Sequence, residues 1–260
     1  MEERHVQYEV RDGAAVLTLD RPRARNALSA QALAELQEGI ARAEADPHVR
    51  VLVLTGAGEK VFCAGGDLTS MAAEDGFLAG HEGRRAYGLL LRRLQEVKKP
   101  SIARVNGHAL AGGLGLVLAC DLAVAVDTAE LGTPEIDVGL FPFQVVALLQ
   151  RHIGRKRALE LVLTGDRIDA GTALEWGLVN RVVPRDDLDA AVGQLAQKLA
   201  HKSQAVLALG RRAFFAAEDL PLAPAMEHLA SQLSLNVLAE DAGEGVSAFL
   251  EKRAPEWKDR

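Results

Sequence analysis

Apolar runs broken by glycine, proline and charged positions divide the first two-thirds of the chain into strands, loops and helices. The almost uniformly apolar runs at 50–56 and 101–105 predict strands that are buried on both faces. Further strands are predicted at 6–10, 14–20 and 122–127. Because strands alternate with loops and helical segments in the middle of the chain, we expect an α/β fold with a parallel sheet.

Helical spacing of apolar residues marks several of the segments between these strands. Ser29 can cap a helix that runs to about Asp46, where Pro47 ends it. A second helix is expected to end at about Val97. The segment 70–83 before it mixes glycines with charged residues, and we expect it to be mobile.

The last third of the chain is predicted to be mostly helical, with one short strand at 178–183. The helices expected there span residues 155–163, 170–176, 186–200, 203–217, 221–240 and 243–252. We therefore expect an α/β core over residues 1–190 and a helical C-terminal part over residues 191–260. No low-complexity segment or long linker separates the two.

Composition and charge narrow the possible functions. The 260 residues are 48% hydrophobic and 25% charged, which is ordinary for a globular protein. A formal net charge of −6 argues against nucleic acid or an anionic membrane as a partner. The chain has no apolar run long enough for a transmembrane helix and no visible signal segment. Cys63 and Cys120 lie far apart outside any metal-binding motif, so we expect reduced thiols in a cytoplasmic protein and no metal.

Two glycine-rich loops form the candidate site. Gly65–Gly66 ends the loop after the strand at 50–56, and Gly112–Gly113 opens a helix after the strand at 101–105. Neither loop has the glycine spacing of a dinucleotide site or of a P-loop. Each could present a backbone N–H group, and two such donors aimed at one oxygen form an oxyanion hole. Equally, the glycines could merely permit tight turns and close helix packing.

Six segments resemble those of the crotonase, or enoyl-CoA hydratase/isomerase, family, and they follow the family's order along essentially the whole chain. They are LDRPRARNALS (19–29), FCAGGDL (62–68), VNGHALAGGLGLVLACD (105–121), PEIDVGL (134–140), GRKRALELVLTGDRIDAGTALEWGLVNRVV (154–183) and FLEKRAPEWKD (249–259). The resemblance implies a spiral of ββα turns and a C-terminal helical module that assembles trimers, often paired into hexamers. It also implies a coenzyme A thioester substrate, as in fatty acid metabolism, with no separate cofactor.

In this family two backbone N–H groups bind the thioester oxygen, and those positions match Gly66 and Gly112. Removing a proton beside a thioester, or adding a nucleophile two carbons away, places negative charge on that oxygen, which two fixed donors stabilise. Family hydratases typically add two glutamates for proton transfer. Glu135 matches the second, and partial burial would raise the pKa of its carboxyl. Gly115 stands where the first would be.

The glycine at position 115 changes the reaction that the resemblance implies. A single base can take a proton from C2 of an enoyl-CoA and return it at C4, which is the pattern of family isomerases, so isomerisation is favoured over hydration. A hydratase remains possible if a second acid comes from elsewhere, and the candidates are Asp137, Glu74, Asp75, His81 and Glu82. Glu135 could instead be a charge at a helix entry or surface turn after Pro134. The missing acid at Gly115 also leaves open a non-catalytic acyl-CoA-binding protein. RNA binding, credited to some members, is disfavoured by the net charge.

The resemblance also implies residues that contact the substrate. The segment with Arg23 and Arg25 meets the nucleotide part of coenzyme A in relatives, and the stretch with Lys252 and Lys258 can reach a neighbouring subunit's ligand. Each of these charges could equally be solvated surface. Ala64 and Asp67 are candidates because they lie beside the oxyanion glycine, although Asp67 could have a structural role instead. Phe141 and Phe143 would narrow the acyl pocket, unless they are simply part of the core.

Overall fold

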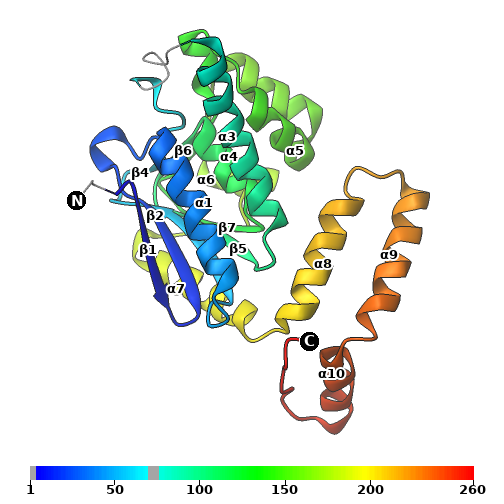
Figure 1. Ribbon diagram of the computed structural model, residues 1–260. Coiled ribbons are helices and arrows are strands. Elements are labelled where there is room, and N and C mark those ends of the chain that lie inside the picture. Colours follow the sequence, from blue (N-terminus) through cyan, green and yellow to red (C-terminus); the bar gives the residue numbers. More distant parts are fainter. Residues whose placement is uncertain (1–3, 70–75) are drawn as a thin grey trace.

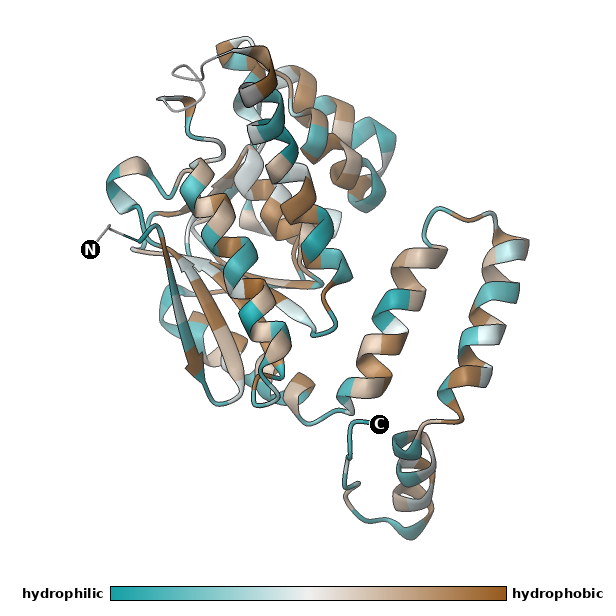
Figure 2. Cartoon of the chain, viewed as in Figure 1, coloured by the Kyte–Doolittle hydropathy of each residue, from teal (hydrophilic) through white to brown (hydrophobic). Residues whose placement is uncertain are grey.

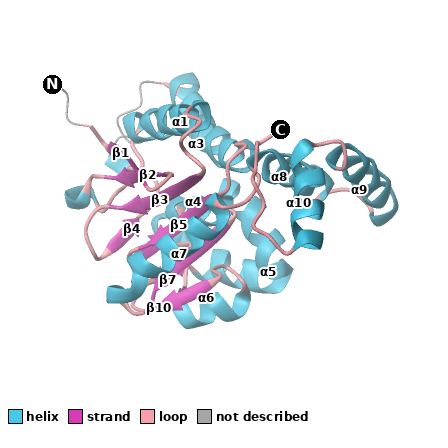
Figure 3. Cartoon of the chain, turned by 90° about the horizontal axis from the view of Figure 1, so that it is seen from below, coloured by secondary structure: helices cyan, strands magenta, loops and turns pink. Residues whose placement is uncertain are grey.

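The computed structural model describes residues 4–69 and 76–260, and it shows an α/β body from which helices extend at the C-terminal end (Figure 1). The larger of two sheets has the strand order β1-β2-β3-β5-β7-β10 (Figure 3). Its strands are β1 (Val6–Arg11), β2 (Ala14–Leu19), β3 (Val51–Gly56), β5 (Ser101–Val105), β7 (Leu122–Val126) and β10 (Arg181–Val183). All neighbours are parallel except β1 and β2. The predicted α/β class and the predicted parallel sheet are therefore confirmed.

A second sheet, which the sequence did not predict, has the strand order β4-β6-β8-β9. Its members are β4 (Val61–Cys63), β6 (His108–Leu110), β8 (Glu130–Gly132) and β9 (Arg167–Asp169). The first three pair in parallel and β9 is antiparallel to β8. Each strand has only three residues, which is too short for an alternating pattern of apolar and polar positions to stand out.

From β3 to β8, successive strands of the chain alternate between the two sheets. The pairs β3–β4, β5–β6 and β7–β8 each contribute one strand to the larger sheet and the next strand to the smaller one. A helix follows each of the first two pairs, namely α3 (Phe77–Glu96) and α4 (Gly112–Ala119). The body is thus a spiral of ββα turns, and equivalent loops of successive turns lie beside one another.

The helices of the body agree with the predicted segments except near position 80 and before residue 155, where the helix predicted at 155–163 already begins at residue 143. In α1 (Ala30–Ala45) the Ser29 side chain accepts a hydrogen bond from the Ala32 N–H, as expected for a cap. The segment 70–83 was expected to be mobile, but α3 begins at Phe77 and includes its last seven residues. Residues 70–75 lie outside the described part of the chain.

α4 runs through the centre of the body. Residues 113–119 are all buried, and the helix is apolar on every side, which is the composition of a helix with no solvent-facing side. It packs against α3 and against α5 (Phe143–Thr164), which bends where Gly154 has a positive φ of 73°. α6 (Ala170–Trp176) follows, and α7 (Leu188–Ala200) packs on β3, β5 and β7.

Three helices extend from the body at its C-terminal end: α8 (Gln204–Ala217), α9 (Leu222–Asn236) and α10 (Glu240–Glu251) (Figure 1). Large apolar side chains are exposed along them, as Figure 2 shows in brown, including Phe214, Leu222, Met226, Leu233, Leu238, Phe249 and Leu250. None of the described helices is both long and apolar enough to cross a membrane. The boundary expected at residue 190 falls inside α7, and the division into two domains stays a prediction.

Candidate active site

The loop after β4 exposes the backbone N–H of Gly66. Leu28 bridges this loop in parallel: its N–H donates to the Gly65 carbonyl oxygen (2.8 Å), and its carbonyl oxygen accepts from the Asp67 N–H (3.1 Å). In such a bridge the residue between the two bonds points its own N–H the other way. The exposed Gly66 therefore directs its N–H away from Leu28, and no acceptor meets it among the described residues.

The second loop leads from β6 into α4 and leaves the first N–H groups of that helix available. The N-cap residue is Ala111, whose side chain has no acceptor atom, and its backbone adopts a positive φ of 54°. The first N–H groups of a helix lack partners within the helix and carry the positive end of its dipole. Gly112 thus presents its N–H at the start of a buried helix.

Glycines hold the two loops in direct contact. A Cβ on Gly65, where φ is +98°, would lie 2.5 Å from the Ala111 Cβ and 3.1 Å from the Gly112 nitrogen. A Cβ on Gly113 would collide with the carbonyl group of Cys63. Only glycine permits this approach at positions 65 and 113, so the predicted close packing of the loops is present, while the oxyanion role stays a prediction. That packing brings Gly66 and Gly112 into the same corner of the molecule.

Glu135 provides a carboxyl group whose surroundings are poor in partners. It lies in a short 3₁₀ helix (Pro134–Val138), where Pro134 sets the first position, and the residue is partly buried. Its Oε2 atom is buried and has no hydrogen-bond partner among the described residues. Burial raises the pKa of the Glu135 carboxyl, although a hydrogen bond from its own backbone N–H opposes the shift. This is a carboxyl group suited to accepting a proton.

Gly115 faces a residue that the sequence analysis missed. The Tyr87 hydroxyl, which comes from α3, donates a hydrogen bond of 2.7 Å to the carbonyl oxygen of Gly112 and lies against Gly115. Burial raises the pKa of the Tyr87 hydroxyl, and the nearby Cys63 and Glu135 raise that pKa further, so Glu135 and Tyr87 belong to one region. Tyrosine in an ordinary helical segment carries no local signal of such a role, so sequence reasoning had no means to find it.

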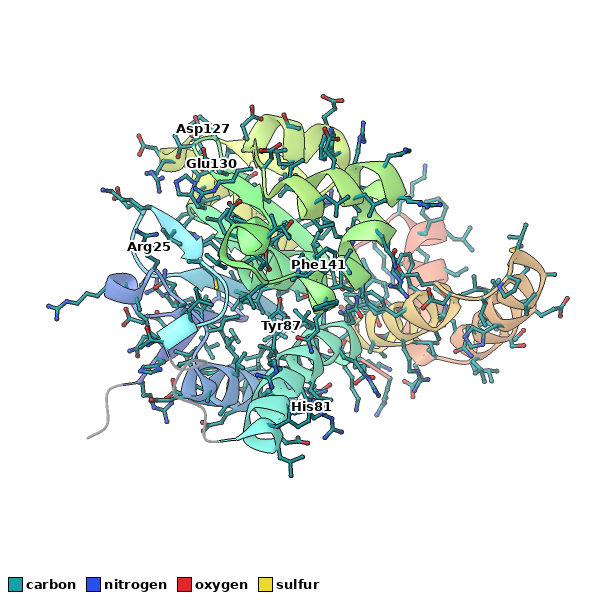
Figure 4. The ribbon with its side chains drawn as sticks, turned by 90° about the horizontal axis from the view of Figure 1, so that it is seen from above. Arg25, His81, Tyr87, Asp127, Glu130 and Phe141 are labelled. Atoms are coloured by element: carbon teal, nitrogen blue, oxygen red, sulfur yellow. The ribbon has the colours of Figure 1, made fainter. Side chains whose placement is uncertain are left out.

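The other candidate acids are placed less favourably. Asp137 is exposed, and Glu82 is exposed and pairs with Arg85 (3.3 Å). His81 stacks on Phe77 near the outer end of α3, well removed from Tyr87 (Figure 4). Glu74 and Asp75 lie outside the described residues. Among the candidates that the structure describes, Glu135 alone has a buried carboxyl oxygen without a partner, and its charge acts on Tyr87, whose hydroxyl donates a hydrogen bond to the Gly112 carbonyl oxygen.

A cavity of about 380 Å³ opens beside the first glycine loop and is rich in basic groups. Its lining includes Arg25, Lys60, Ala64, His108, Arg167 and Arg185, with Glu59 as the acidic member. The loop with Arg25 is fixed because the buried Asn26 side chain donates to the carbonyl oxygens of Ala57 (2.9 Å) and Val61 (2.8 Å). The structure thus brings Arg25 and Ala64 together, and Ala64 donates its N–H to the Arg25 carbonyl oxygen (3.1 Å).

The remaining candidates for substrate contact lie elsewhere. Arg23 is exposed and does not line the cavity. Asp67 forms an ion pair with Arg21 (2.8 Å), which favours its structural role. Lys252 and Lys258 follow α10 in the C-terminal extension, and neither lines the cavity.

The two phenylalanines differ in their surroundings. Phe141 is partly buried and packs against the core, whereas Phe143 is 76% exposed. Their ring centroids are 5.1 Å apart. No group of His, Cys, Asp or Glu residues in the described ranges is arranged to hold a metal ion.

Comparison with known proteins places these features in a family. Residues 9–260 match the family described as enoyl-CoA hydratase/isomerase. A 2,3-dehydroadipyl-CoA hydratase of Escherichia coli is 38% identical over 247 residues, which cover 94% of this chain and 95% of that protein. A crotonyl-CoA hydratase of Syntrophomonas wolfei is 35% identical over 253 residues, which cover 96% of each chain.

Solved structures agree over nearly the whole chain. The crystal structure of an enoyl-CoA hydratase from Mycobacterium smegmatis has a TM-score of 0.94 at 38% identity and covers 98% of this chain and 99% of its own. That of human enoyl-CoA hydratase domain-containing protein 3 also has a TM-score of 0.94, at 34% identity, and covers 98% of this chain and 100% of its own. The spiral of ββα turns is therefore the crotonase fold, and the chain belongs to the enoyl-CoA hydratase/isomerase family.

Proposed function

We propose that the protein isomerises the double bond of enoyl-CoA thioesters. The N–H groups of Gly66 and Gly112 bind the thioester carbonyl oxygen, and Glu135 moves a proton along the acyl chain. The observation that carries the proposal is the buried carboxyl oxygen of Glu135 without a partner, found in a protein whose two touching glycine loops leave the N–H groups of Gly66 and Gly112 without an acceptor among the described residues. Family membership supports the acyl-CoA substrate.

The proposed reaction needs only one base. With a 3-enoyl-CoA, the Glu135 carboxylate removes a proton from C2, and the electron pair moves onto the thioester oxygen, where the two N–H donors stabilise it. The protonated Glu135 then returns the proton to C4, and the double bond is left between C2 and C3. No atom is gained or lost. Burial favours this role, because a raised pKa makes the Glu135 carboxylate a stronger base.

Hydration is the second candidate, and the names of the relatives support it, because several are hydratases. Hydration adds the hydroxyl of water at C3 and a proton at C2. It requires a group that holds and activates the water in addition to a proton donor. Position 115, where family hydratases typically carry a glutamate, is glycine here, which is why we favour isomerisation.

The basic cavity is proposed to receive the phosphates of coenzyme A. Arg25 lines it together with Lys60, Arg167 and Arg185, and such groups bind phosphate oxygens through charge-assisted hydrogen bonds. No cofactor besides the coenzyme A of the substrate is proposed. We place the protein in the cytoplasm.

A homotrimer or a hexamer is proposed because of the C-terminal extension. The exposed apolar side chains of α8, α9 and α10 would be covered in such an assembly. Lys252 and Lys258 would then reach the ligand of a neighbouring subunit. Sedimentation of the purified protein tests the oligomeric state.

Product analysis in deuterated water with Glu135→Gln and Asp137→Asn tests the proposed function. The wild type is expected to convert cis-3-hexenoyl-CoA into trans-2-hexenoyl-CoA. Glu135→Gln should lower this rate by about a hundredfold or more while binding of the thioester persists. Asp137→Asn, two residues along the chain and exposed, should leave the rate unchanged. A 3-hydroxyacyl product as the main outcome would identify a hydratase, and binding without turnover a non-catalytic member.

A further inference from the structure

The space beside Gly115 is already occupied. A Cβ built on Gly115 would lie within 3.0 Å of the Tyr87 hydroxyl oxygen, which is closer than real side chains approach, and 3.2 Å from the Cγ2 atom of Val145. Tyr87 comes from α3 and Val145 from α5, so two helices enclose this face of α4. Glycine is therefore the only residue that fits at position 115 while Tyr87 keeps its place.

Tyr87 is held firmly in this position. Its hydroxyl donates to the Gly112 carbonyl oxygen (2.7 Å), which anchors the ring on the first turn of α4. One turn away, the Gln144 side chain donates to the Arg84 carbonyl oxygen (3.0 Å) and ties α3 to the start of α5. Gly88 makes room for that contact, because a Cβ there would lie 2.8 Å from the Gln144 amide nitrogen. Figure 4 shows the Tyr87 side chain directed into the middle of the body.

Tyr87 fills the space without replacing the chemistry of a carboxylate. Burial, together with the nearby charge of Glu135, holds the pKa of the Tyr87 hydroxyl well above 10, so the group stays neutral at physiological pH. A phenol has one proton to donate, and Tyr87 already donates it to Gly112. A neutral phenol is a poor base for water. The Tyr87 oxygen also occupies the space that the carboxylate of a second acid would have to reach.

We propose that Tyr87 is the specificity-determining residue of this site: by filling the space beside Gly115 it excludes a second acid and the water that such an acid would activate. This inference rests on the proposed function of Glu135 as the single base. With water excluded on that side, the enolate formed at C2 has one proton source, the protonated Glu135, and collapses by protonation at C4. The same fold with this space open would allow water to add across the double bond.

The test compares two initial rates on each enzyme preparation: hydration of trans-2-hexenoyl-CoA and isomerisation of cis-3-hexenoyl-CoA. Their ratio is independent of the fraction of folded protein, so a merely structural effect of a substitution does not change it. Tyr87→Ala should raise the ratio of hydration to isomerisation at least about tenfold, because water gains the vacated space. The double variant Tyr87→Ala/Gly115→Glu should raise it further, because the new carboxylate can activate that water.

Two further variants make the result specific to this space. Gly115→Glu alone should lose both activities and much stability, because Tyr87 blocks the new side chain, and Tyr87→Ala should relieve that loss. Tyr8→Ala is the matched control, because it removes the chain's other tyrosine, which packs under Arg42 away from the glycine loops. Its ratio should equal that of the wild type.

A ratio within twofold of the wild-type value in both Tyr87→Ala and the double variant overturns the proposal. If those proteins do not fold, Tyr87→Phe decides, because it removes only the hydroxyl and should raise the ratio severalfold. An unchanged ratio in Tyr87→Phe then overturns it. Failure of the proposed isomerase function can be told apart from failure of the Tyr87 proposal, because it is measured on the wild type alone. Wild-type hydration that is faster than isomerisation, or no wild-type turnover at all, overturns the proposed function and the Tyr87 proposal together.

Discussion

Arg211 of α8 forms two hydrogen bonds with the carboxylate of Asp121, at 2.7 Å and 2.8 Å, across 90 positions of sequence. Both side chains are mostly buried, with 11% and 16% of their surface exposed. The same guanidinium donates to the carbonyl oxygens of Leu94 (3.2 Å) and Val97, and the Asp121 carboxylate accepts from the Ser101 N–H (2.7 Å). This ion pair joins the extending helix α8 to the end of α4 and to β5.

Replacing Arg211 should therefore weaken the attachment of α8 to the body. Arg211→Met leaves the Asp121 carboxylate without its buried cation, and such a change typically lowers the free energy of unfolding by about 3–5 kcal/mol. We expect a value near the lower end, because Ser101 still donates hydrogen bonds to the carboxylate. Urea unfolding at a fixed protein concentration measures the change. Arg212→Met, next in sequence but exposed, is the control and should cost less than about 0.5 kcal/mol. Equal losses in the two variants would contradict this assignment.

Gly65→Ala should damage both stability and activity. The substitution forces a side chain onto a residue with φ of +98° and drives its Cβ into Ala111, so the two glycine loops must move apart. We expect a loss of about 2–3 kcal/mol and a fall in kcat/KM of about a hundredfold, because removal of one oxyanion donor costs that much in other enzymes.

Gly58→Ala is the matched control for that change. Gly58 also has a positive φ, of +79°, but a Cβ there meets nothing within 4 Å. It should lose only about 1 kcal/mol and keep its kcat/KM. If the two variants behave alike, the contact between the loops has no part in activity.

The pH dependence of kcat/KM should follow the titration of Glu135. The base must be ionised, and burial raises the pKa of its carboxyl, so the rate should rise with pH through a midpoint above the ordinary glutamate value of about 4.5. Initial rates of isomerisation between pH 4 and pH 9 measure this. In Asp137→Asn the midpoint should be unchanged. A midpoint at or below 4.5 would exclude Glu135 as the titrating base.

Glu135 should also make the protein less stable at neutral pH than its amide variant. Because its pKa is raised in the folded state, the folded protein binds more protons than the unfolded chain between the two pKa values, and stability falls as pH rises through that interval. Glu135→Gln should therefore gain on the order of 1 kcal/mol at pH 7, since it removes a buried charged oxygen without a partner. Thermal unfolding at pH 4 and pH 7 should show the gain only at pH 7.

Arg25 should contribute to binding of the substrate's phosphates, whereas Arg23 should not. Both are exposed arginines of one loop, but only Arg25 lines the basic cavity. Arg25→Gln should raise the KM for enoyl-CoA about threefold to fivefold at low ionic strength, with a smaller effect at high salt. Arg23→Gln serves as the control. A KM increase of the same size in both variants would mean a general charge effect.

The helices and strands could be predicted from the sequence wherever a pattern of apolar and polar residues extends over five or more positions. β3 and β5 are apolar throughout because both faces are covered, and α1 begins at Ser29 because its hydroxyl caps the first turn. Gly65 and Gly113 are visible in the sequence, and at these two positions only glycine allows such close contact between loops. The motifs around them also carry the family assignment.

The tertiary structure decided what depends on contacts between distant segments. The second sheet consists of three-residue strands that exist only because the spiral places them side by side. Asp121 comes just after α4 in the sequence, but its carboxylate pairs with Arg211, 90 positions away. The sequence shows that position 115 lacks an acid, but only the packing of α3 places the Tyr87 hydroxyl in that space. Sequence patterns report the periodic burial of each segment, whereas which side chain fills a given space depends on how helices far apart in the chain pack together.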